Sequence, residues 1–231
     1  MCIIAVSPAG IRQPDTAALR HMFENNPHGA GYMVARNGRV EISKGYMRWE
    51  DFSRAITREA FTAADPVVYH FRISTQAGVN PEMTHPFPLT AFLDKTKFLD
   101  CTCPIGVAHN GIIQLTSDRR DKEYSDTAHY IAEFLRYLVR TPEDLRKDAI
   151  LDAIRRTTNS KWALMDGDGY IATVGNFIEE DGVLFSNSTF RAPERRTAFK
   201  CKNYTPIRSF FEDDPYADED DPYADDLAYW R

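Results

Sequence analysis

The sequence lacks several features that would assign the protein to a class at once. None of its 231 residues lie in a stretch approaching the ~20 consecutive apolar residues of a membrane-spanning helix. The N-terminus shows no basic segment followed by an apolar core, so no secretory signal is recognised. Four cysteines are too few for a disulfide framework in a chain of this length. We therefore predict a cytoplasmic protein with reduced thiols and no membrane contact.

Basic residues are not gathered into a cluster either. The net charge is −6, and residues 212–231 alone carry −8, so residues 1–211 carry +2. Binding to nucleic acid needs lysines and arginines concentrated on one face, so we predict no nucleic-acid contact. Hydrophobic residues make up 43% of the chain, which is enough for one sizeable core or at most two small ones.

The acidic charge lies in a C-terminal segment that contains the clearest repeat of the chain. The sequence Asp-Asp-Pro-Tyr-Ala-Asp occurs at 213–218 and again at 220–225. Acid-rich sequence interrupted by proline buries too little apolar surface to order itself. We therefore predict one domain over residues 1–205 and a disordered acidic tail over residues 206–231. The alternative is that the tail is a short docking motif for a partner.

Strand and helix signals alternate along the body of the chain. Asn37-Gly38 between two apolar runs is a strong signal for a hairpin. The predicted strands are 2–7, 31–36, 39–43, 67–72, 105–109, 162–166, 170–174 and 183–186. The predicted helices are 16–24, 49–61, one that starts at 125–127, and 141–156. Helices gathered in the middle, with strands before and after them, indicate sheets covered by helices.

Cys2 directly follows the initiator methionine and opens an apolar run that is typical of a buried strand. Removal of Met1 would place a thiol and a free α-amine on the same residue. A thiolate is a strong nucleophile, and an α-amine with an unperturbed pKa of about 7.7–8.0 can accept and return a proton near neutral pH. Taken alone, Cys2 is better interpreted as a small buried hydrophobe, and only the remaining motifs reverse that interpretation.

Two motifs at predicted strand ends have possible roles in binding and catalysis. Arg72 ends a strand and is followed by Ser74 and Thr75, an arrangement suited to a carboxylate, although most arginines form surface ion pairs. Asn110-Gly111 also follows a strand, where such a pair is usually a plain turn. Its functional interpretation is an oxyanion hole, because the Asn110 side-chain NH₂ and the Gly111 backbone N–H can point to one spot.

Three further signals are weaker. Asp126 lies at a predicted helix start, where a carboxylate is by default a cap and otherwise a ligand for an ammonium group. His85 lies in a proline-rich loop. Cys101 and Cys103 could bind a metal with His85 and His109, but zinc sites favour a Cys-x₂₋₄-Cys spacing and no second cysteine pair is present. We therefore predict no metal and no cofactor, and a loop with partly buried thiols at Cys101 and Cys103.

Taken together, the order and spacing of these motifs resemble a class II glutamine amidotransferase domain, a branch of the N-terminal nucleophile hydrolase superfamily. The resemblance covers roughly residues 2–190. It is carried by Cys2 and by the segments 26–31, 70–75, 85–87, 109–111, 125–127, 161–166 and 184–188. Several family members have a His-Arg-Gly-x-Asp element early in the chain, whereas residues 25–31 here contain no arginine. The sequence looks closer to the small stand-alone branch of the family.

The resemblance implies an α+β fold, a four-layer αββα sandwich of two mostly antiparallel sheets. It also implies hydrolysis of the glutamine side-chain amide to glutamate and ammonia. Cys2 matches the nucleophile that forms a thioester, and its own amine would move the proton. Asn110 and Gly111 match the oxyanion-hole pair. Arg72 matches the residue that binds the glutamine α-carboxylate, and Asp126 matches the residue that binds the α-amine.

The residue types agree with a glutamine site, because a zwitterion with a distant amide needs a cation, an anion and a nucleophile. Ser74, Thr75 and His85 complete the predicted substrate-binding set. The expected partner is a separate ammonia-accepting enzyme, for which the acidic tail is a candidate tether. Two alternatives stay open: a hydrolase of another γ-glutamyl amide or peptide, and a non-catalytic regulatory or binding protein with the same fold.

Overall fold

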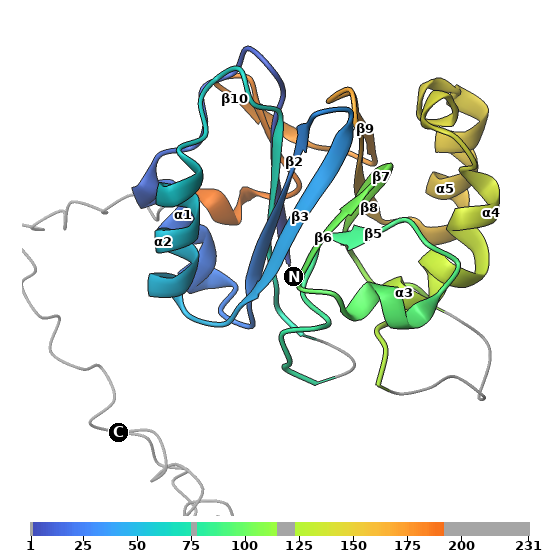
Figure 1. The fold of residues 1–231 in the computed structure, drawn as a ribbon, viewed down its shortest axis with the longest axis horizontal. Helices are drawn as coiled ribbons and strands as arrows, with labels where there is room; N and C mark the ends of the chain where they lie inside the picture. The colour runs from blue at the N-terminus through green and yellow to red at the C-terminus, as the bar shows by residue number, and fades with distance from the viewer. Residues whose placement is uncertain (1, 75–77, 115–122, 192–231) are drawn as a thin grey trace, which may run out of the picture. The chain divides into compact units, whose positions relative to one another are not determined.

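The computed structural model describes residues 2–74, 78–114 and 123–191, and it is a mixed α+β structure with two antiparallel sheets (Figure 1). The predicted domain boundary near residue 205, the acidic tail and Thr75 lie outside these residues. Among the residues that the structure describes, no helix is both long enough and apolar enough to cross a membrane.

The larger sheet has seven strands within the described residues, in the order β10-β11-β1-β4-β2-β3-β6. Its strands are β1 (Ile3–Ser7), β2 (Ala30–Arg36), β3 (Arg39–Tyr46), β4 (Val67–Phe71), β6 (Asp100–Cys103), β10 (Ile178–Glu180) and β11 (Val183–Phe185). The predicted hairpin between β2 and β3 is confirmed. Asn37 and Gly38 both have positive φ, 52° and 71°, as a two-residue hairpin turn requires.

The smaller sheet has the order β5-β7-β8-β9 in the part of the chain that is described. Its strands are β5 (Phe87–Pro88), β7 (Ile105–Asn110), β8 (Lys161–Asp166) and β9 (Ile171–Val174). The helices are α1 (Thr16–Asn25), α2 (Trp49–Glu59), α3 (Asp126–Tyr130), the π-helical turn η2 (Ile131–Leu135), α4 (Arg136–Leu138) and α5 (Asp148–Thr158). Short 3₁₀ turns are η1 (Leu93–Lys97), η3 (Pro142–Arg146) and η4 (Ser188–Phe190).

Side-chain alternation along the strands divides the core into three apolar clusters. On β1, Ile3 and Ala5 pack in a cluster with α1 and α2, whereas Ile4 and Val6 pack with residues of the smaller sheet. On β8, Trp162 and Leu164 pack with the helical segment that begins at α3. The two sheets therefore share one inner layer, and each has helices on its outer face (Figure 1).

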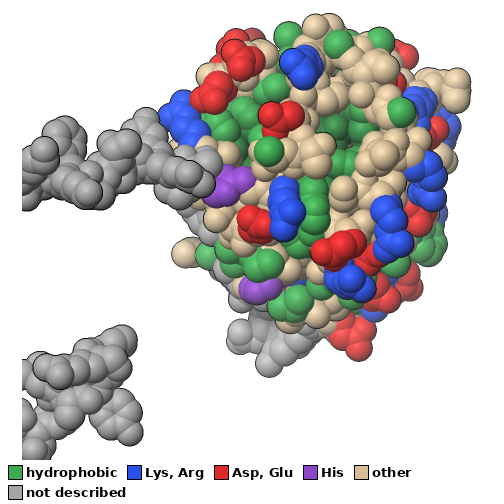
Figure 2. All heavy atoms as spheres, turned by 90° about the vertical axis from the view of Figure 1, so that its left-hand side faces the viewer, with side chains coloured by type: hydrophobic (Ala, Val, Ile, Leu, Met, Phe, Trp, Pro, Cys, Tyr) green, Lys and Arg blue, Asp and Glu red, His purple; other side chains and the backbone are tan. Residues whose placement is uncertain are grey.

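The outer layers differ in character. Aromatic rings dominate the contact of α1 and α2 with the larger sheet, where the Phe52 and Phe71 ring centroids lie 5.3 Å apart. Figure 2 views the molecule from the side of these helices and shows acidic and basic side chains interspersed with apolar ones. Arg20–Glu24 and Arg54–Asp51 are ion pairs on these helices. Such exposed pairs each contribute little to stability.

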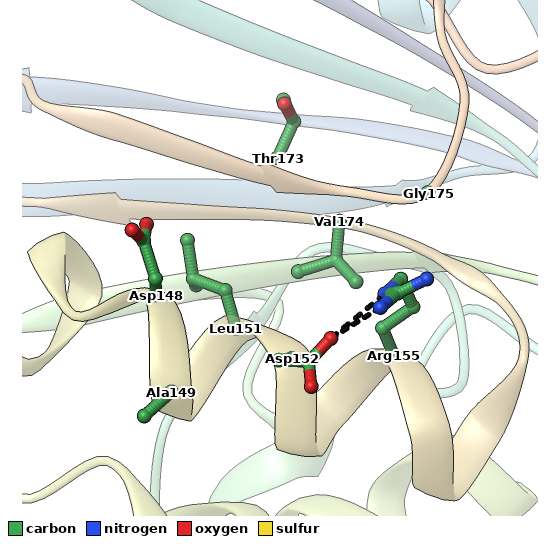
Figure 3. A pocket seen from close by; sticks show the side chains of 8 residues that line it. All are labelled: Asp148, Ala149, Leu151, Asp152, Arg155, Thr173, Val174 and Gly175. Atoms are coloured by element: carbon green, nitrogen blue, oxygen red, sulfur yellow. Dashed lines mark hydrogen bonds and ion pairs between the residues drawn. The ribbon is translucent and has the colours of Figure 1, made fainter.

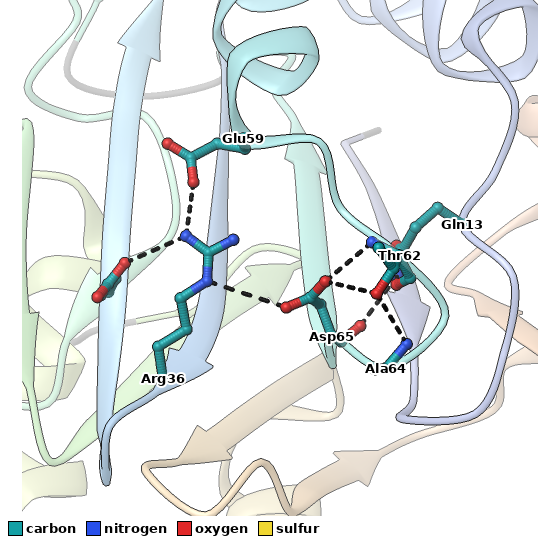
Figure 4. A network of polar contacts seen from close by, with 7 residues as sticks. Gln13, Arg36, Glu59, Thr62, Ala64 and Asp65 are labelled. Atoms are coloured by element: carbon teal, nitrogen blue, oxygen red, sulfur yellow. Dashed lines mark hydrogen bonds and ion pairs between the residues drawn. The ribbon is translucent and has the colours of Figure 1, made fainter.

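A polar network ties the end of β2 to the connection between α2 and β4 (Figure 4). Arg36 Nη1 lies 2.6 Å from a Glu59 oxygen, and Arg36 Nε lies 3.9 Å from Asp65. Asp65 in turn accepts a 2.8 Å hydrogen bond from the Thr62 backbone N–H. This network fixes the loop between α2 and β4 against the end of β2.

Two sequence-based predictions are wrong in detail. The helix predicted over 141–156 is interrupted at Lys147, whose backbone is extended, and its first part is the separate turn η3, where Asp144 accepts the backbone N–H groups of Arg140 and Thr141 and caps the start. The loop predicted at Cys101 and Cys103 is the edge strand β6, paired with β3. A four-residue strand with one buried side chain has too little alternation to be recognised from sequence.

Candidate active site

Alternation brings the predicted nucleophile to the inner layer between the sheets. Cys2 lies two residues before Ile4, which packs in that layer. Arg72 lies two residues after His70, and His70 is the register partner of Ile4. The same register therefore makes Cys2 and Arg72 neighbours at the end of two paired strands. The Ile73 backbone N–H lies 3.3 Å from Cys2 Sγ, which is a direct contact between the two segments.

The smaller sheet contributes the predicted oxyanion pair by the same rule. Asn110 is two residues beyond Ala108, which packs in the inner layer. It closes β7 opposite Lys161, the first residue of β8. Gly111 follows in close contact with the next turn, since a Cβ built on it would lie 2.3 Å from Ser160 Oγ. Only glycine fits there without displacing Ser160.

One cavity collects these groups. It has a volume of about 630 Å³ and is lined by Cys2, Ile73, Asn110 and Gly111 on one side and by residues 156–161 at the end of α5 on the other. Cys2 and Asn110 are more than a hundred residues apart in the sequence, and the structure brings both to the lining of one cavity. The arrangement can therefore present a thiol and two N–H donors to one small molecule.

A second hollow lies between α5 and β9 (Figure 3). Its volume is about 420 Å³, and Leu151 and Val174 are among its lining residues. Two of its three charged lining side chains, Asp152 and Arg155, form an ion pair, and the third is Asp148. The hollow contains no thiol and no histidine among its described lining residues, so it offers less chemistry than the cavity at Cys2.

The electrostatics of Cys2 oppose spontaneous ionisation. The residue is partly buried, and burial raises the pKa of its thiol. The Ile73 backbone hydrogen bond and the charge of Arg72 act in the opposite direction and only partly offset burial. The thiol is therefore mostly protonated at neutral pH, so a reaction at Cys2 needs a base to remove the proton.

Arg72 is held from both sides of its backbone. Its N–H donates to Gly29 O at 2.8 Å, and its carbonyl accepts the His28 N–H at 2.9 Å. His28 Nδ1 also accepts the Ser74 N–H at 2.9 Å. Burial lowers the pKa of the Arg72 guanidinium, while the nearby Cys2 and Asp126 raise it. His28, to which the sequence analysis assigns no role, thus holds the segment that contains Arg72 and Ser74 by two hydrogen bonds.

Of the two interpretations of Asp126, the helix cap does not hold, because Ser125 is the N-cap of α3. Ser125 Oγ accepts the Ala128 N–H at 3.2 Å. Asp126 instead accepts the Ile113 N–H at 2.7 Å and the Thr127 N–H at 2.8 Å, so it ties the chain after Gly111 to α3. An ionised carboxylate has about four acceptor positions. The two backbone bonds and a longer one of 3.3 Å from Thr127 Oγ1 leave one acceptor position for an ammonium group.

His85, predicted as a substrate ligand, is buried away from the cavity wall as far as the described residues show. Its ring lies 4.3 Å from the His70 ring and 4.6 Å from the Phe87 ring, centroid to centroid. Burial lowers the pKa of His70 and of His109 to about 3, and that of His85 well below its usual 6.5. This histidine cluster, His70, His85 and His109, is therefore neutral at pH 7.

No site for a metal emerges from the described part of the chain, where no group of three or more His, Cys, Asp or Glu side chains is arranged to hold an ion. No protein-family model matches the sequence, and no curated protein matches it. The functional interpretation therefore depends on the residues and their geometry.

Proposed function

We propose that this chain hydrolyses the side-chain amide of glutamine through a thioester on Cys2, in the manner of a class II glutamine amidotransferase. The observation that carries the proposal is the single cavity that joins Cys2 from the larger sheet with Asn110 and Gly111 from the smaller one. The two sheets with helices on their outer faces agree with the four-layer sandwich of the N-terminal nucleophile hydrolases, and that assignment belongs to the proposal.

The reaction begins with a proton transfer within one residue. Removal of Met1 exposes the Cys2 α-amine, which accepts the thiol proton and compensates for the raised pKa of the thiol. The thiolate attacks the amide carbon. The Asn110 carboxamide N–H and the Gly111 backbone N–H stabilise the oxygen that becomes negative. Collapse breaks the C–N bond, and the α-ammonium returns its proton to the leaving ammonia. Water then hydrolyses the thioester and releases glutamate.

The other end of glutamine is bound by charge. Arg72 pairs with the α-carboxylate and Asp126 with the α-ammonium group. Support comes from Arg72, because Cys2 and Asp126 each raise the pKa of its guanidinium and are therefore within electrostatic range of the cation. Ser74 lies two residues after Arg72 in the segment that His28 contacts, and its hydroxyl would donate a hydrogen bond to the glutamine α-carboxylate. A partner enzyme in trans would consume the ammonia.

A related substrate class is favoured by the size of the cavity. A volume of about 630 Å³ lies within the range of about 300–1,000 Å³ typical for drug-sized ligands, whereas glutamine is smaller than such ligands. Hydrolysis of a γ-glutamyl amide with a larger leaving group would use the same nucleophile and the same binding residues, Arg72 and Asp126. A comparison of glutamine with γ-glutamyl-p-nitroanilide as substrates separates the two functions.

Intact mass before and after treatment with a diazo-ketone analogue of glutamine tests the mechanism. We expect loss of Met1 and one adduct, which Cys2→Ala abolishes and Cys101→Ala retains. Cys101 is a matched control because it is also partly buried but lies on β6, outside the lining of the cavity. Retention of Met1, or an adduct that persists in Cys2→Ala, would contradict the proposed nucleophile.

A further inference from the structure

The segment after β11 contacts both halves of the candidate site. Register pairing of β1 with β11 ends at Ala5 and Phe185, and the Ser186 N–H continues it by donating to Ile4 O at 2.9 Å. The reciprocal bond is different, because the Ile4 N–H donates to Ser186 Oγ at 2.9 Å rather than to the Ser186 carbonyl. The Ser186 hydroxyl oxygen therefore takes the place of the Ser186 carbonyl oxygen as acceptor in the hydrogen-bond ladder with β1.

The freed Ser186 carbonyl is used by the other sheet. Lys161 Nζ donates a hydrogen bond to it, from the first residue of β8. Lys161 is the register partner of Asn110, so the end of β8 is attached to the segment after β11 beside the oxyanion pair. The chain at Ser186 thus bridges the two sheets where they form the site.

Ser186 Oγ also accepts a 2.8 Å hydrogen bond from Asn110 Nδ2. In the observed orientation Ser186 Oγ accepts from the N–H groups of Ile4 and Asn110 with its two lone pairs, while Asn110 Oδ1 is buried without a hydrogen-bond partner among the described residues. The Asn110 nitrogen has two hydrogens, so one points to Ser186 and the second stays available to a substrate oxygen. Ser186 is fully buried, so water does not compete for these bonds.

Asn187 fixes the nucleophile in a parallel way. Its Nδ2 donates to the Cys2 carbonyl at 2.7 Å, while its Oδ1 accepts the Thr189 N–H at 3.0 Å. The bond to Thr189 determines which end of the Asn187 carboxamide faces Cys2. The adjacent side chains of Ser186 and Asn187 therefore hold the oxyanion donor Asn110 and the nucleophile Cys2, which come from different sheets.

We propose that Ser186 is a positioning residue that orients the Asn110 carboxamide with its N–H toward the substrate oxygen, an inference that rests on the proposed function. Without the Ser186 hydroxyl, the carboxamide is free to rotate by half a turn. Its carbonyl oxygen would then face the developing negative charge and repel it. Ser186 is outside the lining of the cavity and would act on the reaction through Asn110, while its bond to the Ile4 N–H holds β1.

The test compares amide hydrolysis with alkylation in Ser186→Ala, because iodoacetamide alkylates a thiol without forming an oxyanion. We expect kcat for glutamine hydrolysis to fall about tenfold to a hundredfold, less than the about 10²–10³-fold cost of removing an oxyanion donor. The KM and the alkylation rate of Cys2 should stay at the wild-type values. Ser7→Ala is the matched control, since Ser7 is buried on β1 and its Oγ has no hydrogen-bond partner among the described residues.

Equal kcat values for Ser186→Ala and Ser7→Ala would overturn the proposal. If the wild-type protein does not hydrolyse glutamine, the proposed function fails, and NMR of the Asn110 side-chain amide decides the positioning role separately. Those signals, assigned by their loss in Asn110→Asp, should move in Ser186→Ala and not in Ser7→Ala. Unchanged signals in Ser186→Ala would overturn the positioning role whatever the enzyme does.

Discussion

The two ends of the layer between the sheets are built from the same strands yet differ in chemistry. At one end Val6 and Val68 meet Met165, and all three are buried hydrophobic residues. At the other end the same inward-facing rows continue as Cys2 and Arg72. The pleat does not change between the two ends, and only the residue types do. A functional site can therefore form where polar residues occupy the last inward-facing positions of strands that otherwise build a hydrophobic core.

The comparison also separates what each end contributes. Burial of apolar side chains stabilises the fold in proportion to the area removed from water. The polar end instead contains a guanidinium whose pKa burial lowers, which costs stability because a charge loses hydration, and a partly buried thiol that stays protonated at neutral pH. Substitutions at the apolar end should therefore change mainly the stability, and substitutions at the polar end mainly the reaction rate.

The largest effect is expected at the apolar end. Met165→Ala should lower the free energy of unfolding by about 2–5 kcal/mol, because a fully buried side chain leaves a cavity. Urea denaturation measures this, and kcat for glutamine per folded molecule should not change. A loss of kcat in folded Met165→Ala would show that the two ends are not independent.

The converse is expected for Asn110→Ala at the polar end. Loss of the oxyanion donor should lower kcat by about 10²–10³-fold, which corresponds to about 2.7–4 kcal/mol. The free energy of unfolding should fall by only about 1 kcal/mol, for the lost bond to Ser186. Steady-state kinetics and urea denaturation of the same preparation check both. A rate close to wild type would remove Asn110 from the oxyanion hole.

Near neutral pH the smallest effect concerns the histidine cluster, whose contribution to stability changes only as the pH falls below 6.5. His70 and His109 stay neutral in the folded protein down to about pH 3, whereas their usual pKa is 6.5. Below pH 6.5 the unfolded chain therefore binds more protons, so stability is full above pH 6.5 and is lost as the pH falls toward 3. Each buried histidine should add a slope approaching about 1.4 kcal/mol per pH unit.

His85→Leu tests this reasoning, because it removes one ring whose pKa burial also lowers. The free energy of unfolding should fall less steeply between pH 6.5 and 4 than in the wild type. Met165→Ala is the control, since it should shift the whole profile without changing its slope. An unchanged slope in His85→Leu would show that His85 accepts no extra proton on unfolding.

Much of the fold could be predicted because its signals are local. The Asn37-Gly38 turn and the strand at residues 2–7 follow from patterns within a few residues. Edge strand β6 could not be predicted because its pairing with β3 decides it, and the break at Lys147 could not because no glycine or proline marks it in the sequence.

The candidate site divides in the same way. The sequence alone determined that Cys2, Arg72 and Asn110 stand at strand ends, and the two-residue period determined only which residues share a face with each of them. Only the tertiary structure decided that these ends meet, that His85 is buried behind other rings, and that Ser186 bonds to Asn110. The physical reason is that a pattern along one strand specifies its faces but not its neighbours. The order β11-β1-β4 comes from the packing of segments far apart in the chain.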